Sequence, residues 1–198
     1  MIRRPPRSTQ SRSSAASDVY KRQKKYFADL NSAIISLDCS AFNKVVSLVE
    51  KSKKKSGKII LIGNGGSAAI ASHLAIDFTK AANIRAINFN ESSLLTCFSN
   101  DYGYEHWAEM ALEFYADNDD IVILISSSGQ SENIINAGRK AKKMGLSLIT
   151  LSGFLESNPL KELGDINLWV DSSEYNVVEN THQIWLLAVV DYLIESNK

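Results

Sequence analysis

Short apolar runs alternate with longer amphipathic segments along most of this 198-residue chain. Segments whose apolar positions recur every three or four residues are typical of helices, and short continuous apolar runs are typical of buried strands. Continuous runs, as opposed to alternating ones, indicate a parallel sheet that is covered by helices on both faces. The pattern therefore predicts one doubly wound α/β domain, with strands at residues 59–62, 84–89, 121–125, 147–151 and 167–171.

The expected helices fill the intervals around these strands. Two helices are expected before the first strand and one directly after the loop at residue 63. The others are expected at 92–97, 105–115, 132–144, 160–163 and 177–196, with a turn at 100–103.

Residues 1–23 differ from the rest of the chain, because they hold two prolines, many serines and arginines and almost no apolar side chain. Such a segment cannot bury a core and is expected to be disordered. A transit peptide is one interpretation of it. We favour a non-native cloning scar, with the domain at residues 24–198.

The formal net charge of zero results from an uneven distribution of charges. Residues 1–23 hold six of the 22 basic residues and one of the 22 acidic residues, which leaves 16 basic and 21 acidic residues in the remainder. An acidic body has no general attraction for nucleic acid, so no nucleic-acid partner is expected. The apolar run at residues 184–190 is too short to span a bilayer, and no membrane association is expected. Cys39 and Cys97 lack metal-ligand spacing and are expected to be reduced thiols of a cytoplasmic protein.

A glycine-rich loop, GNGGS at residues 63–67, directly follows the first strand and opens a helix. Glycine lets the backbone turn sharply and approach a ligand closely. With Ser67 as the expected N-cap, the free N–H groups of the first helical turn form a seat for an anion such as phosphate. His73 and Asp77 lie four residues apart on this helix and share a face. We interpret the segment as a phosphate loop leading into a helix with acid–base or metal-ligand groups; an ordinary strand–helix turn is the alternative.

A second polar loop follows the third strand, with hydroxyl groups at Ser126, Ser127, Ser128 and Ser131 and a helix start beside them. Hydroxyl and backbone N–H groups at the carboxyl end of a strand suit a phosphate monoester. A serine-rich surface turn is the alternative. The first loop also fits the dinucleotide pattern G-x-G-x-x-A, but Glu91 comes late for the acid that such sites use. No nucleotide cofactor is expected, and the two loops together indicate a phosphorylated small molecule.

Three motifs in the order GNGGSAAIASH, SNDYGYEHW and LISSSGQSENIINA resemble the sugar isomerase (SIS) domain family, over roughly residues 27–195. The resemblance implies a five-stranded parallel sheet and a homotetramer with active sites between subunits. It also implies a cytoplasmic aldose–ketose isomerase, most similar to family members that act on sedoheptulose 7-phosphate in heptose and lipopolysaccharide or other surface polysaccharide biosynthesis.

The same resemblance implies roles for particular residues of this chain. The serines of the second loop would hold the sugar phosphate: Ser126, Ser127, Ser128 and Ser131. The first loop and the SNDYG turn would contact the sugar: Asn64, Gly65, Gly66, Ser67 and Asp101. Some members bind zinc through His and Glu on the helix after the first loop and through Gln and His on the last helix.

This chain departs from that zinc pattern. His73 and Asp77 match the first pair, with Asp in place of the usual Glu, and Glu179 stands where the family has Gln. Leu187 occupies the position of the second His. His182 shares a helix face with Glu179 and would replace the missing ligand if the helix were rotated or shifted. The possible zinc ligands are therefore His73, Asp77, Glu179 and His182, with a surface or interface pair as the alternative for the last two.

Aldose–ketose interconversion moves a proton between C1 and C2 through a cis-enediolate, so it needs a base, an acid or metal for the oxyanion, and a phosphate grip. Asp77 and Glu179 are the candidate bases, His182 the candidate acid, and His73 an orienting group. Two other functions remain open. A non-catalytic SIS module that binds a sugar phosphate or a protein partner is favoured by Leu187, and a dinucleotide-dependent oxidoreductase is disfavoured by the serine loop.

Overall fold

The computed structural model describes residues 10–196 of the chain, with side chains from residue 17 onward. Its centre is an all-parallel sheet in the order β2-β1-β3-β4-β5. The α/β class and the five-stranded parallel sheet are both confirmed. The strands are β1 (Ile59–Gly63), β2 (Ala86–Asn88), β3 (Ile121–Ile125), β4 (Ser147–Ser152) and β5 (Ile166–Trp169).

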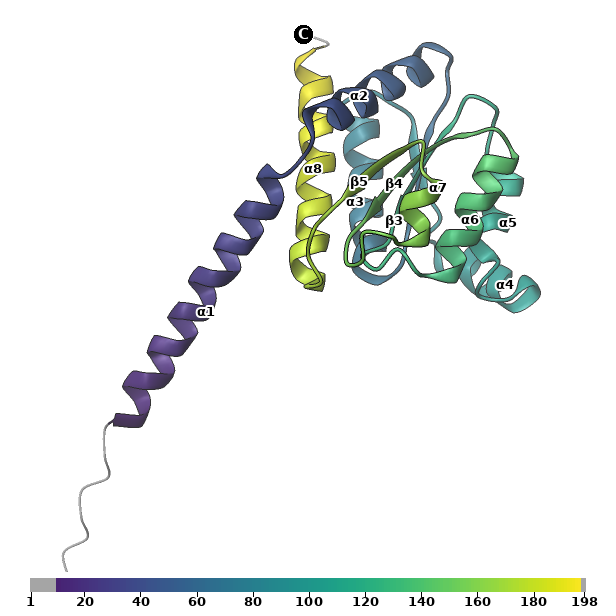
Figure 1. Cartoon of the computed structure of the whole chain (residues 1–198). Helices are drawn as coiled ribbons and strands as arrows, with labels where there is room; N and C mark the ends of the chain where they lie inside the picture. The colour runs from purple at the N-terminus through teal and green to yellow at the C-terminus, as the bar shows by residue number, and fades with distance from the viewer. Residues whose placement is uncertain (1–9, 197–198) are drawn as a thin grey trace, which may run out of the picture.

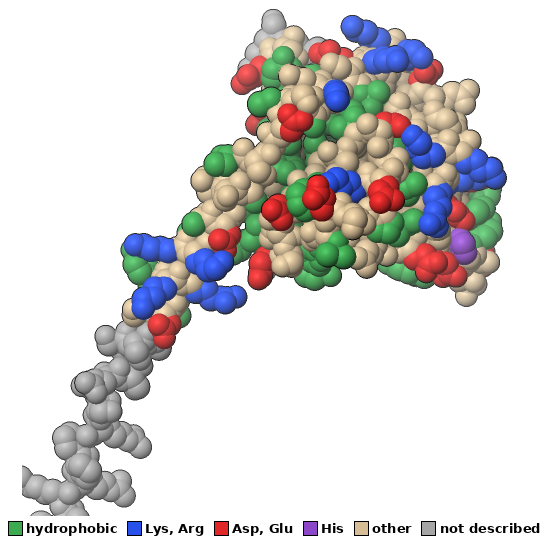
Figure 2. All heavy atoms as spheres, viewed as in Figure 1, with side chains coloured by type: hydrophobic (Ala, Val, Ile, Leu, Met, Phe, Trp, Pro, Cys, Tyr) green, Lys and Arg blue, Asp and Glu red, His purple; other side chains and the backbone are tan. Residues whose placement is uncertain are grey.

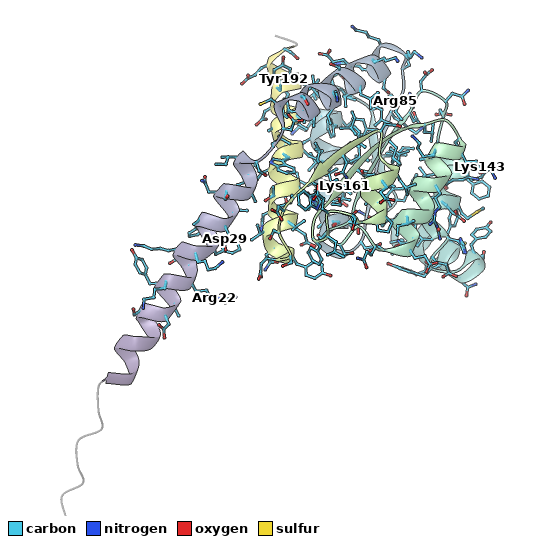
Figure 3. All side chains as sticks on the ribbon, viewed as in Figure 1. Arg22, Asp29, Arg85, Lys143, Lys161 and Tyr192 are labelled. Carbon is cyan, nitrogen blue, oxygen red and sulfur yellow. The ribbon has the colours of Figure 1, made fainter. Side chains whose placement is uncertain are left out.

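Helices cover both faces of this sheet (Figure 1). Helices α2, α3 and α8 pack on one face, and α5, α6 and α7 pack on the other, with α4 beside them. Tyr192 of α8 meets Phe42 of α2 edge-on, with ring centroids 6.0 Å apart (Figure 3). The helices are α1 (Gln10–Ile35), α2 (Cys39–Lys54), α3 (Gly65–Lys80), α4 (Ser92–Tyr102), α5 (Trp107–Tyr115), α6 (Glu132–Lys143), α7 (Pro159–Leu163) and α8 (Tyr175–Glu195).

The two central strands explain why the sequence shows continuous apolar runs. In β1, Ile59 and Leu61 belong to the core on the α3–α8 side, and Ile60 and Ile62 belong to the core on the α5–α6 side. Every residue of β1 and β3 is buried. Since alternate side chains point to opposite faces, a strand covered on both sides needs apolar residues at every position.

Helix α1 is the main departure from the expected structure. Residues 10–23, expected to be disordered, are the first part of this helix, and residues 1–9 lie outside the described part of the chain. Trp185 Nε1 donates a hydrogen bond of 2.8 Å to the Ile34 carbonyl, so the end of α1 is held against α8. Asn180 of α8 also donates to the Tyr26 hydroxyl at 3.2 Å, and Asp29 lines a cavity with residues 171–174. The part of α1 before these residues, which carries Arg22, leads away from the domain (Figures 1 and 3). Helix formation needs no core when residues of adequate helix propensity follow one another.

Within the described residues, no single helix is both long and apolar enough to cross a membrane, although Ser17–Ile35 and Cys39–Lys54 pass that test together as a pair bent by 62°.

Two helix boundaries also differ from expectation. Helix α3 begins at Gly65, so Ser67 lies inside its first turn and is not the N-cap; Asn64 holds that position. The expected turn at residues 100–103 is instead the last turn of α4, which ends where Gly103 adopts a φ of 90°. Both shifts come from glycines, whose positive φ values let the chain enter or leave a helix at those residues.

Candidate active site

The two polar loops meet at the carboxyl edge of the sheet because β1 and β3 are parallel neighbours. They enclose a cavity of about 120 Å³. All four serines that were expected to hold phosphate line it, and α8 closes its side. The lining residues are Asn64, Ser67, Ile125, Ser126, Ser127, Ser128, Ser131, Tyr175 and Glu179.

The serine loop is pinned by its backbone, and its hydroxyl groups make few bonds within the loop; the Ser128 hydroxyl accepts from the Gln130 N–H at 3.2 Å. Ser126 donates its N–H to the Leu151 carbonyl at 3.0 Å, and the Ser127 carbonyl accepts from Gly153 at 2.9 Å. The Ser127 hydroxyl is buried and has no hydrogen-bond partner among the described residues. Ser131 is the N-cap of α6, but its side chain makes no capping bond and lies 3.4 Å from the Ser126 hydroxyl. Unused hydroxyl groups beside a helix N-terminus form a cradle for an anion.

Glu179 reaches across from α8 to the glycine loop. A Cβ atom added to Gly66 would lie 2.3 Å from Glu179 Oε2, so a side chain at residue 66 would displace this carboxylate from its present position. The carboxylate makes no hydrogen bond or ion pair with another described residue and lines the cavity. It is the one carboxylate among the lining residues, which places a potential proton acceptor beside the serine cradle.

Asn64 lies between this cavity and a second one of about 330 Å³. Its side chain exchanges two hydrogen bonds of 2.9 Å with Asn133 of α6, and its oxygen also accepts from the Tyr104 hydroxyl at 3.3 Å. Sequence analysis did not single out Asn133 or Tyr104. The lining residues of the second cavity are Gly63, Asn64, Gly65, Ala68, Asn90, Leu95, Thr96, Ser99, Tyr104 and Trp107.

Asp101, expected to contact the sugar, lines neither cavity of its own subunit. It is exposed near the end of α4, with its carboxylate 3.7 Å from Cys97 Sγ and 2.9 Å from Asn100 Nδ2. Desolvation and this carboxylate raise the pKa of the Cys97 thiol. Within one subunit, Asp101 is therefore not part of the site that the two loops form.

His73 and Asp77 form a pair on the outer side of α3, as their spacing predicted. His73 Nε2 lies 3.1 Å from Asp77 Oδ2, and Gln183 Nε2 of α8 donates to His73 Nδ1 at 3.1 Å. The amide donor leaves the ring proton on Nε2, facing the carboxylate. The side chains of His73 and Asp77 are 48% and 32% exposed, and neither lines the cavity.

His182 does not join this pair, and its place in the structure gives no support to the expected catalytic and metal-binding roles. The residue is completely buried, and its Nε2 donates to the Ser152 carbonyl at 3.1 Å while Nδ1 has no partner among the described residues. Burial lowers the pKa of His182 to about 4, which the bond to Ser152 only partly opposes. A neutral imidazole inside the core is a structural residue.

The residues present do not fit a zinc site. Zinc takes three or four ligands at bonding distance, from Cys, His, Asp or Glu side chains. Among the described residues, no group of three or more such side chains is close enough to hold a metal ion. Glu179 lies at Gly66, His182 lies in the core, and Leu187 packs partly buried against that core. Only His73 and Asp77 of the expected ligand set are brought together.

Two polar loops meet at the carboxyl edge of this five-stranded parallel sheet, where open α/β sheets bind their ligands. A family model described as the SIS domain matches residues 24–153. The chain belongs to the SIS domain family. Its relatives include the phosphoheptose isomerase of Helicobacter pylori (strain P12), 31% identical over 177 residues, which cover 85% of this chain and 92% of the relative. The phosphoheptose isomerase of Aliarcobacter butzleri (strain RM4018) is 36% identical over 145 residues, or 70% and 76% of the two chains.

Solved structures agree with these relatives. A phosphoheptose isomerase from Neisseria gonorrhoeae superimposes with a TM-score of 0.82 at 25% identity, over 90% of this chain and 99% of that chain. The NanR protein of Vibrio vulnificus, solved in complex with ManNAc-6P, gives a TM-score of 0.66 at 21% identity, over 93% of this chain and 64% of that chain. The second likeness is one of fold alone.

Proposed function

We infer that the chain is an aldose–ketose isomerase of a phosphosugar, and that sedoheptulose 7-phosphate is its substrate. The relatives at 31% and 36% identity are phosphoheptose isomerases. The observation that carries the inference in this chain is the cavity itself. It combines a cradle of serine hydroxyls with a single carboxylate, Glu179. A phosphate grip and a base are two of the elements that a proton transfer between C1 and C2 requires.

The phosphate is proposed to sit between the serine loop and the start of α6. The hydroxyl groups of Ser126, Ser127, Ser128 and Ser131 surround this part of the cavity. Backbone N–H groups of the first helical turn and the helix dipole favour a dianion there without an Arg or Lys side chain. This grip holds the sugar in place while the other end of the molecule reacts.

Glu179 is proposed as the base, in preference to Asp77. Its carboxylate is unpaired and lines the cavity, whereas the Asp77 carboxylate is paired with His73 outside it. Glu179 would take the C1 proton of the open-chain ketose, the C–H electron pair would form the C1–C2 double bond, and the carbonyl electron pair would move to O2, the enediolate oxygen. The O1 hydroxyl proton would pass to O2, and return of the carbon-bound proton from Glu179 to C2, with O1 becoming the carbonyl oxygen, would give the aldose. Since the donor set does not fit zinc, no step is assigned to a metal.

Solvent exchange tests this function directly. Sedoheptulose 7-phosphate incubated with the protein in deuterated water should acquire deuterium at C1, and the aldose product at C2, as read by NMR. Proton return from a carboxylate that exchanges with solvent predicts this label. No label at either carbon with any heptose or hexose phosphate would rule out the isomerase, and a non-catalytic sugar-phosphate-binding module would then explain the cavity.

We also propose a homo-oligomer, a tetramer in the arrangement that the SIS resemblance implies. Large apolar side chains remain exposed on α1, α3 and α8: Val19, Tyr20, Phe27, Ile76, Ile184 and Tyr192. Figure 2 shows apolar and basic side chains on the projecting part of α1, away from the domain. Exposed apolar area on this scale favours contact with another copy. In such an assembly Asp101 would contribute to a neighbouring subunit's cavity.

The exposed free thiols of Cys39 and Cys97 support a reducing, cytoplasmic location.

A further inference from the structure

We propose that Asn133, together with Tyr104, positions the side chain of Asn64 so that it offers the bound phosphosugar one N–H donor and no acceptor. The inference rests on the proposed function for the identity of the ligand. It adds two positioning residues, from α6 and from the loop after α4, to a site that the sequence motifs assign to the glycine and serine loops.

The arrangement joins the two loops through a pair of side-chain amides. Asn64 Nδ2 donates to Asn133 Oδ1 and Asn133 Nδ2 donates to Asn64 Oδ1, both at 2.9 Å. Asn133 lies in the first turn of α6 and is only 2% exposed. A flip of one amide alone would face oxygen with oxygen and nitrogen with nitrogen, and a flip of both together would take the Asn64 oxygen away from the Tyr104 hydroxyl, so Asn133 and Tyr104 set the orientation jointly.

Counting donors and acceptors shows what remains for a ligand. An Asn side chain has two N–H donors and an oxygen that accepts two hydrogen bonds. The Asn64 oxygen accepts from Asn133 and from the Tyr104 hydroxyl at 3.3 Å, so both acceptor positions are used. One N–H is used by Asn133, and one N–H is left. Because Asn64 lines both cavities, the free N–H is available to an oxygen atom of the ligand.

The position of Asn64 in the chain indicates that this orientation serves the ligand. Asn64 is the N-cap of α3, a position where Asn usually accepts a hydrogen bond from the helix's own first turn. Its side chain makes no such bond and turns toward α6 instead. The helix therefore forgoes a stabilising cap. Since the serine hydroxyls already surround the phosphate position, the donor from the other loop is assigned to a sugar oxygen.

Calorimetric titration of two ligands separates this role from a general effect on the fold. Asn133→Leu removes the amide at nearly constant volume and frees Asn64 to rotate. The dissociation constant for sedoheptulose 7-phosphate should rise about tenfold, the usual value of one hydrogen bond. That for inorganic phosphate should stay within about twofold, because the serine loop is unchanged. Tyr104→Phe, at a 58% exposed residue, should weaken sugar binding by a smaller factor without disturbing the core.

Asn136→Leu is the matched control. Asn136 is also buried on α6, but its amide donates to the Glu105 carbonyl and touches neither cavity. Equal losses for both ligands, no loss for sugar phosphate in Asn133→Leu and Tyr104→Phe, or an equal effect of Asn136→Leu would each overturn the proposal. Binding without turnover in the wild type would count against the isomerase alone. No binding of sedoheptulose 7-phosphate to the wild type would overturn both.

Discussion

Two acidic side chains lie on neighbouring helices of this domain, and their surroundings differ in a way that separates their chemistry. Glu179 of α8 lines the cavity, unpaired, against the backbone of Gly66. Asp77 of α3 lies outside the cavity, with its carboxylate 3.1 Å from His73. An unpaired carboxylate that lines the cavity can reach a bound ligand, whereas the Asp77 carboxylate is occupied by the His73 ring outside the cavity. A shared helix face with acidic and His residues is therefore a weaker indication of a catalytic role than the contacts that each side chain makes in the folded structure.

The largest effect is expected when the two carboxylates are neutralised in turn. Glu179→Gln keeps the shape of the side chain but removes the base, and kcat should fall by about 10³-fold, within the range for loss of a general base. KM should change little, because the phosphate grip lies in the serine loop. Steady-state kinetics of sedoheptulose 7-phosphate conversion measure both quantities.

Asp77→Asn is the matched substitution outside the cavity, and its kcat should fall less than tenfold by the same argument. The comparison between the two carboxylates would be reversed by a larger loss in Asp77→Asn than in Glu179→Gln. In that case a shift of α8, or a neighbouring subunit, brings the His73 pair to the reacting carbons.

The next effect concerns His182, which shares its helix with Glu179 but lies in the core. Its folded-state pKa of about 4 is below the ordinary value of 6.5. Between these values the unfolded chain binds a proton that the folded chain does not, so the free energy of unfolding falls as the pH falls from 6.5 to 4. The loss should reach about 3 kcal/mol at pH 4.

Urea unfolding at pH 7 and pH 4.5 tests this assignment. His182→Gln keeps a donor for the Ser152 carbonyl and removes the titration, so it should be less stable at pH 7 but should lose less stability on acidification than the wild type. Thr181→Val, at a buried neighbour on the same helix that does not titrate, is the control and should keep the wild-type pH dependence. If His182→Gln also keeps the wild-type slope, another group carries the acid sensitivity.

The serine cradle should show a smaller effect, on affinity. Replacing Ser128 and Ser131 together by Ala removes two hydroxyl groups from the cavity lining, each worth on the order of 1 kcal/mol. Binding of inorganic phosphate and of the sugar phosphate should both weaken by tenfold or more by that estimate, with an unchanged melting temperature. The exposed Ser173→Ala is the control. An unchanged affinity in the double variant would move the phosphate away from this loop.

Much of this fold could be predicted from the sequence because its strongest signal is burial. A strand such as β3 is apolar at every position, and continuous apolar runs with helices between them indicate a parallel sheet that is covered on both faces. The meeting of the two polar loops could be predicted for a related reason, since glycine and serine clusters directly after parallel buried strands come together at the carboxyl edge of the sheet.

Features that depend on distant neighbours were missed. Nothing near His182 in the sequence indicates that its ring meets the Ser152 carbonyl, 30 residues away. The contact between Gly66 and Glu179 and the amide pair of Asn64 and Asn133 are likewise products of packing between elements. Local signals also misplaced the start of α3, because a positive φ at Gly65 lets the helix begin before Ser67.

The smallest effect, and the most direct test of the outer pair, is Leu187→His. Leu187 lies one helical turn beyond Gln183, which contacts His73, so a histidine there would approach the His73–Asp77 pair and complete three possible zinc ligands. Zinc affinity should rise roughly tenfold or more, because even an outer-shell partner of a metal ligand changes affinity by about 10- to 100-fold. Competition with a chromophoric chelator measures it without reference to activity. Ile184→His, at an exposed position on the same helix, is the control and should gain much less. A wild type that already binds zinc as tightly as Leu187→His would contradict the poor fit between these residues and a metal. Equal gains in both variants would show that any surface histidine suffices.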